Sequence, residues 1–111
     1  MLPPDLVLTL ATPQDRDFIA RLSERVFSVF GPYETFLPGL VGEPGVWTVV
    51  ARSDAANLGF AMFAFETALQ ADLVAIATEP AWQSRGIGRS LLAEVERRVC
   101  EIRRRREAWL G

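Results

Sequence analysis

The sequence predicts one α/β domain with a mixed sheet, in the order strand, helix, short helix, three strands and long helix. Two amphipathic segments, near residues 13–30 and 87–107, have the spacing of helices, and short apolar runs between them are typical of strands. The chain has 111 residues, 50% of them hydrophobic, so one core can form without disulfides or metal. We therefore expect residues 1–111 to form a single domain.

The first third of the chain predicts a short strand followed by a helix. Val7, Leu8 and Leu10 form the apolar run, and the segment 12–15 (Thr-Pro-Gln-Asp) has the pattern of an N-cap, a Pro at the first helical position and an acid at the third. Apolar residues then recur at helical spacing up to Phe30, and Gly31-Pro32 ends the predicted helix.

The middle of the chain predicts a packed loop and three strands. Residues 31–45 are too rich in Gly and Pro for a long helix and too apolar for a disordered linker, so we expect a turn or two of helix there. The runs 46–52 and 58–66 flank a short polar segment and predict an antiparallel hairpin. The run 72–78 is nearly all apolar, which is typical of a strand covered on both faces.

The composition excludes several kinds of site. The chain has no His, no Lys and a single Cys, so it cannot build a Ser-His-Asp or Cys-His site, a Walker phosphate loop or a Schiff base. Only carboxylates remain as metal ligands, and we expect no metal. Residues 1–4 carry no basic targeting segment, and the longest apolar run, 58–65, is too short to span a bilayer. These features predict a soluble, cytoplasmic protein without a membrane partner.

Charge is distributed unevenly along the chain. Residues 1–80 hold four Arg and ten acids, a net charge of −6, whereas residues 81–111 hold eight Arg and four acids, a net charge of +4. An anionic ligand is therefore expected in the last third of the chain. The run of four Arg at 103–106 suits solvent and the C-terminal end of a helix, so a nucleic-acid partner is not expected.

The segment 83–88 (Gln-Ser-Arg-Gly-Ile-Gly) carries the strongest chemical signal. It lies between a predicted strand and a predicted helix, where free backbone N–H groups and the helix dipole bind phosphate. Gly86 and Gly88 lack a Cβ, so a ligand can approach the backbone closely. A dinucleotide-binding fingerprint is excluded because Leu91 occupies its third glycine position. The other interpretation is that the two glycines only ease a tight turn.

In this context the motif resembles the signature Gln/Arg-x-x-Gly-x-Gly/Ala of the GNAT superfamily of N-acetyltransferases. The resemblance covers residues 72–98, including Pro80 and Arg85, and the segment 57–60 (Asn-Leu-Gly-Phe) is similar to the start of that family's third strand. The element order from residue 6 onward also resembles the family's. The resemblance implies the acyl-CoA N-acyltransferase fold, acetyl-CoA as cosubstrate and a small-molecule or peptide amine as acceptor.

The resemblance also assigns residues to acetyl-CoA. It implies that the backbone around Gln83 and Ser84 and the amides of Arg85, Gly86, Ile87, Gly88 and Arg89 bind the pyrophosphate, with Arg85 and Arg89 adding positive charge. It implies that the backbone of Ile76, Ala77 and Thr78 holds the pantetheine arm. The N–H of Ile76 would then polarise the thioester carbonyl.

The resemblance places a general base at Asp72, eleven residues before Gln83. Desolvation at the start of a buried strand would raise the pKa of such a carboxyl toward neutrality. The alternative is an ordinary solvated acid, and Glu66 and Glu79 are weaker candidates for the base. Tyr33, Glu34 and Phe36 lie in the segment that resembles the family's substrate-covering loop, although ordinary packing explains them equally well.

The resemblance stops at the end of the third helix, because the usual fifth strand, fourth helix and last two strands are absent from this sequence. The missing strands imply three alternatives: a homodimer in which a partner subunit covers the open strand, a truncated or frame-shifted chain, or a CoA-binding or interaction module without catalysis. We expect an acetyl-CoA-dependent N-acetyltransferase, with the non-catalytic module as the alternative. The usual general acid, a tyrosine, has no counterpart in this sequence.

Overall fold

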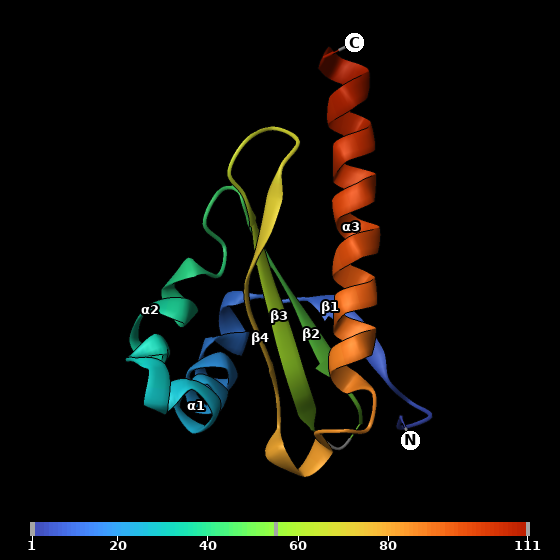
Figure 1. Ribbon diagram of the computed structural model, residues 1–111. Coiled ribbons are helices and arrows are strands. Elements are labelled where there is room, and N and C mark those ends of the chain that lie inside the picture. The colour runs from blue at the N-terminus through green and yellow to red at the C-terminus, as the bar shows by residue number, and fades with distance from the viewer. Residues whose placement is uncertain (1, 55, 111) are drawn as a thin grey trace.

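The computed structural model describes residues 2–54 and 56–110 as a four-stranded antiparallel sheet between helices (Figure 1). The strand order is β1-β2-β3-β4, and α1 and α2 cover one face of the sheet while α3 covers the other. The strands are β1 (Val7–Leu10), β2 (Val46–Arg52), β3 (Asn57–Phe65) and β4 (Ala71–Thr78), and the helices are α1 (Arg16–Phe27), α2 (Tyr33–Leu40) and α3 (Ile87–Leu110). The predicted α/β class and the order of elements are confirmed, whereas the described strands pair only in antiparallel fashion and do not form the predicted mixed sheet.

The start of α1 follows the predicted capping pattern. Thr12 Oγ1 accepts a hydrogen bond from the Gln14 N–H at 3.3 Å, and Asp15 Oδ2 accepts one from the Thr12 N–H at 2.8 Å. The helix is shorter than predicted because both of its ends tighten into 3-10 turns, η1 (Pro13–Asp15) and η2 (Ser28–Phe30). Gly31, with φ of 137°, then redirects the chain toward α2.

Two apolar clusters hold the layers together. The cluster between the sheet and α1/α2 is centred on fully buried Ile19, Leu22, Leu37 and Phe60. The cluster under α3 is centred on fully buried Val49, Phe63, Ile87 and Leu91. Adjacent residues of β3 therefore pack into the clusters on opposite faces of the sheet, and for this reason the sequence of the strand is a continuous apolar run.

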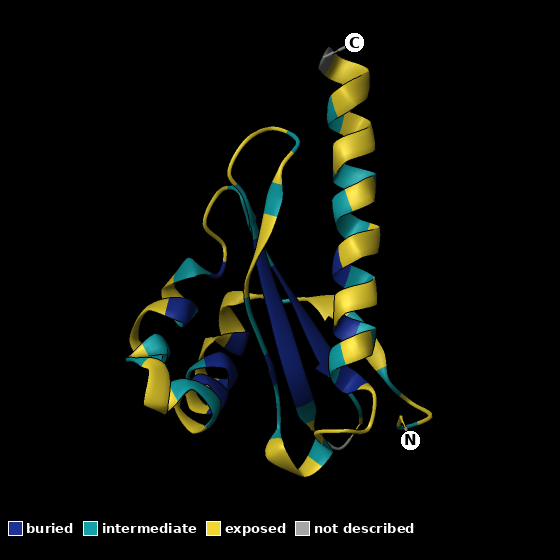
Figure 2. Ribbon diagram, in the orientation of Figure 1, coloured by how far each residue is buried: buried dark blue, intermediate teal, exposed yellow. Residues whose placement is uncertain are grey.

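The prediction that β4 is covered on both faces is wrong for its first half. Leu73 is 46% exposed and Val74 is 41% exposed, and Figure 2 shows β4 much less buried than β2 and β3. β4 is more exposed because it lies at the edge of the sheet and, among the described residues, pairs only with β3. Val74 has no partner in β3, because the register shifts between Met62 and Phe63.

Gly59 sets the distance between β3, β4 and α3. A Cβ at this position would lie 2.6 Å from the Ala77 carbonyl oxygen and 3.3 Å from Leu91 Cδ1. We expect Gly59→Ala to lower the free energy of unfolding by about 1–3 kcal/mol, because backbone must move to admit the methyl group. Gly39→Ala on α2 is the matched control, since beyond its own helix no atom of the described residues lies within 4 Å of a Cβ at this position. Urea denaturation measures both variants, and equal stabilities would contradict the assignment.

A largely buried ion pair joins the start of α1 to the sheet. Arg52 on β2 binds both carboxylate oxygens of Asp15 at 2.8 Å, and its Nε donates to Thr9 Oγ1 at 2.8 Å. Asp15 is only 6% exposed. The pair fixes the end of the sheet at which β3 begins and β4 ends.

No helix in residues 2–54 and 56–110 combines the length and the apolar character needed to cross a membrane.

Candidate functional site

The segment from Gln83 to Gly88 connects β4 to the start of α3, as predicted. Ser84 has φ of 65° and Gly86 has φ of 94°, so two residues of the loop lie in the left-handed region. Gly86 requires glycine for this reason, whereas Gly88 lies in the first turn of α3, where the nearest atom to a built Cβ is Thr78 Oγ1 at 3.8 Å. The two glycines therefore have different roles: Gly86 allows the left-handed backbone conformation, and Gly88 leaves space beside the start of the helix.

The loop opens into a cavity of about 470 Å³ at the start of α3. Thr78, Gln83, Ser84, Gly86, Gly88 and Arg89 line it, together with Trp82 and Leu92. The amides of Ile87, Gly88 and Arg89 have no carbonyl partner within the helix, because the first N–H groups of any α-helix lack one. Free amides, the helix dipole and the Arg89 guanidinium make this cavity suitable for a phosphate group.

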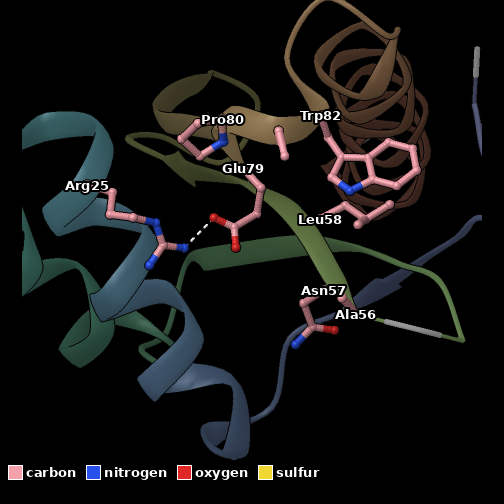
Figure 3. A pocket seen from close by; sticks show the side chains of 8 residues that line it. Arg25, Ala56, Asn57, Leu58, Glu79, Pro80 and Trp82 are labelled. Atoms are coloured by element: carbon pink, nitrogen blue, oxygen red, sulfur yellow. Dashed lines mark hydrogen bonds and ion pairs between the residues drawn. The ribbon is translucent and has the colours of Figure 1, made fainter.

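Two hydrogen bonds and an ion pair hold the turn before the loop, and Figure 3 shows the ion pair, between Glu79 and Arg25. The Glu79 N–H donates to the Leu58 carbonyl at 2.8 Å, and Gln83 Nε2 donates to the Thr78 carbonyl at 3.2 Å. The Glu79 carboxylate pairs with Arg25 of α1, so this acid links α1 to the turn. Glu79, one of the weaker candidates for the general base, therefore has a structural role.

The two loop arginines differ in their surroundings. Arg89 lines the cavity, whereas the Arg85 guanidinium lies 5.0 Å from the centre of the Trp82 ring. Trp82 itself packs partly against the cluster under α3 and also lines the cavity. Ile87 is 1% exposed, so its side chain belongs to the core and only its amide faces the loop.

The second half of β4 leads directly into this loop. Ala77 is buried in the core, Ile76 packs against the cluster under α3, and Thr78 lines the loop cavity. On one side β4 pairs with β3, and in the described part of the chain no strand pairs with its other side. The backbone of Ile76, Ala77 and Thr78 therefore runs along an open edge.

The desolvation expected at Asp72 is absent, because Asp72 is exposed on the edge strand. Its environment is set instead by Glu66, which lies across the β3–β4 hairpin. Hydrogen bonding and charge repulsion from Asp72 raise the pKa of the Glu66 carboxyl above its ordinary value. The two acids thus form a carboxylate pair at the far end of β4 from the loop.

The three predicted substrate residues all lie in α2, but in different surroundings. Tyr33 lines a cleft of about 350 Å³ against β4, and Phe36, 46% exposed, lies with its ring 5.0 Å from that of Tyr33. Glu34 is half-buried, and its Oε2 is shielded from solvent and has no hydrogen-bond partner among the residues that the structure describes. The sequence interpretation missed Phe27, Phe30, Leu73 and Val74, which also line the cleft. The position of Phe30 directly before Gly31-Pro32 is the signal that marks it as outside the helix.

Comparison with known families identifies the fold. The model of the acetyltransferase (GNAT) family matches residues 13–110, which include β2 to β4, the loop and α3. The chain belongs to the GNAT acetyltransferase family. The resemblance that the loop motif predicted is therefore confirmed over most of the chain.

Solved structures agree with this assignment. A protein from Desulfovibrio desulfuricans described as an acetyltransferase of the GNAT family is 31% identical, with a TM-score of 0.73, over 85% of this chain and 65% of that one. An aminoglycoside 6'-N-acetyltransferase complexed with coenzyme A has a TM-score of 0.76 at 16% identity, over 86% of this chain and 56% of that one. A GNAT family acetyltransferase from Brucella melitensis in complex with acetyl-CoA has a TM-score of 0.74 at 21% identity, over 86% and 69%.

The chain spans about 65% and 56% of the lengths of the first two of these proteins. None of the curated proteins matches it.

Proposed function

We propose that this chain binds acetyl-CoA and transfers its acetyl group to a primary amine by direct attack. The observation that carries the proposal is the loop at the start of α3, where two left-handed residues leave free amides facing a cavity lined by Arg89. Membership of the GNAT family and the coenzyme A or acetyl-CoA held by two structures of similar fold support it.

The residues of the loop fit the diphosphate of a CoA. The amides of Ile87, Gly88 and Arg89 donate to its oxygens, Gly88 leaves room for close approach, and the Arg89 guanidinium neutralises charge. Arg85 adds positive potential from its position on Trp82. Gln83 and Ser84 contribute to the lining, and the Gln83 side chain also fixes the end of β4.

The open edge of β4 fits the remainder of the cosubstrate. Extended backbone at Ile76, Ala77 and Thr78 can bind an amide-containing arm as a neighbouring strand would. When bound, acetyl-CoA supplies an acyl group activated as a thioester. The Ile76 N–H is the donor that we assign to the thioester carbonyl, where negative charge develops during attack.

Asp72 is the residue that we assign to proton removal from the amine, with Glu66 beside it. A hydrogen bond to Asp72 and repulsion by its charge raise the pKa of the Glu66 carboxyl. We expect Asp72→Asn to lower kcat about a hundredfold while leaving the Kd for acetyl-CoA unchanged. Stopped assays over a pH series measure kcat, and an unaltered kcat would remove Asp72 from the mechanism.

The acceptor is expected to lie against α2, where Tyr33 and Phe36 offer aromatic rings and Glu34 offers a carboxylate. Amine-dependent release of free CoA thiol from acetyl-CoA tests the whole proposal. Binding of acetyl-CoA without release of thiol for any primary amine would leave the non-catalytic CoA-binding module as the function.

The predicted homodimer uses the same edge of β4 and remains a prediction. A second copy paired along Ile76 to Thr78 would occupy the backbone that the pantetheine arm needs, so the two uses of this stretch exclude each other. Sedimentation velocity with and without acetyl-CoA separates them, because a dimer paired on this edge dissociates as the cosubstrate binds.

A further inference from the structure

An apolar cleft lies between β4 and the end of α1, separate from the loop cavity. Its volume is about 350 Å³, and it is lined by three aromatic residues, Phe27, Phe30 and Tyr33, and by residues 73–76 of β4. It shares no lining residue with the cavity at the start of α3. None of the residues that line it carries a charge.

The walls of the cleft are unusually accessible for apolar side chains. Phe30 is 73% exposed and Leu73 is 46% exposed, while Tyr33 is held between Phe27 and Phe36 with ring centres 5.5 and 5.0 Å away. Aromatic side chains thus form one wall, and the edge strand forms the other. Apolar walls of this kind bind a ring or a branched chain, which removes their surface from water.

The position of the cleft relates it to the reacting atoms. Ile76, whose N–H we assign to the thioester carbonyl, is part of the lining, so a group held in the cleft lies beside the acetyl group. At the other end of the strand segment, Asp72 directly precedes Leu73 and neighbours Glu66. The site therefore combines an uncharged cleft with negative charge at one end, which complements a molecule with one cationic amine and one apolar group.

From this arrangement, and resting on the function proposed above, we infer that the acceptor is a monoamine bearing an aromatic or branched aliphatic group. Phe27, Phe30 and Tyr33 bind the apolar group, and the carboxylate pair attracts the amine. The lining of the cleft has no charged side chain to pair with the additional ammonium groups of a polyamine or an amino sugar, so the cleft disfavours both classes.

Titration with 2-phenylethylamine and with spermidine, followed by NMR on the full chain with and without saturating CoA, tests the inference. We expect 2-phenylethylamine to bind about tenfold more tightly than spermidine. We expect Phe30→Ala to weaken the binding of 2-phenylethylamine about tenfold, the effect of losing one buried ring contact. Val29→Ala is the matched control, because Val29 is 83% exposed in the same turn and does not line the cleft.

Spermidine binding as tight as that of 2-phenylethylamine would overturn the inference, as would an unchanged affinity in Phe30→Ala. A further arm compares hexanoyl-CoA with acetyl-CoA. If Phe30→Ala weakens hexanoyl-CoA alone, the cleft holds the acyl chain and the inference is wrong. Binding of the amine through Phe30 without any binding of CoA would refute the proposed function and, with it, the role of the amine as acceptor. Binding of CoA without binding of the amine through Phe30 would refute only the inference.

Discussion

We expect Gly86→Glu to abolish the binding of acetyl-CoA. Gly86 has φ of 94°, a backbone conformation that residues with a side chain rarely adopt. The substitution therefore disturbs the loop and also places a negative charge beside the diphosphate. Isothermal titration calorimetry should detect no heat of binding at acetyl-CoA concentrations that saturate the unsubstituted chain.

A second variant separates loss of binding from loss of fold. Gly88→Asp has space for its side chain, since beyond its own helix the nearest described atom to a Cβ at this position is Thr78 Oγ1 at 3.8 Å, and an acid in the first turn stabilises a helix. The variant should keep its thermal stability. It should nevertheless bind acetyl-CoA at least about tenfold more weakly, because the introduced carboxylate repels the phosphate groups. Ala93→Asp, exposed one turn later, is the control and should bind normally. Full affinity in Gly88→Asp would show that the phosphates lie elsewhere.

Asp15→Ala should lower the free energy of unfolding by about 3 kcal/mol, because removing one partner of a buried ion pair costs far more than removing an exposed one. The substitution leaves the Arg52 guanidinium without the carboxylate that accepts two of its hydrogen bonds, and it removes the acceptor for the Thr12 N–H. Urea denaturation measures the loss. Asp17→Ala, exposed two residues later, is the control with an expected change below about 1 kcal/mol.

The same pair predicts how stability depends on pH. The hydrogen bonds from Arg52 hold the pKa of the Asp15 carboxyl below its ordinary value. Its contribution is therefore complete above about pH 4, the pKa in the unfolded chain, and is lost as the pH falls through the lower pKa of the folded state. Asp15→Asn should flatten this acid dependence. Parallel plots of unfolding free energy against pH for the two proteins, from about pH 5 to about pH 2, would contradict the role of Asp15.

Local patterns in the sequence were sufficient to predict most of the fold. The capping sequence at Thr12, the alternation of apolar residues and the glycine pair each depend on neighbours within a few positions, and these features are present in the structure as predicted. The burial of β4 was predicted wrongly because apolar composition cannot distinguish a central strand from an apolar edge strand. Only the pairing order of the sheet, a long-range property, identifies Leu73 and Val74 as exposed.

The candidate site was predictable in its loop and less so in its cleft. The loop from Gln83 to Arg89 is one continuous segment, so a local sequence motif can predict it. The Glu79 pairing with Arg25, the Asp72 pairing with Glu66 and the cleft of Phe27, Phe30 and Leu73 join residues from distant parts of the chain. Side chains brought together by tertiary packing leave no local pattern, and the resemblance to the family supplied only Asp72 among them.

Thermal unfolding of the chain with and without acetyl-CoA tests the central claim most directly. A ligand at about 100 times its Kd adds about 2.7 kcal/mol to the free energy of unfolding, which raises the Tm of a domain of this size by roughly 10 °C. We expect a rise of this order at millimolar acetyl-CoA. An unchanged Tm would contradict the claim that the loop from Gln83 to Arg89 is a CoA-binding site.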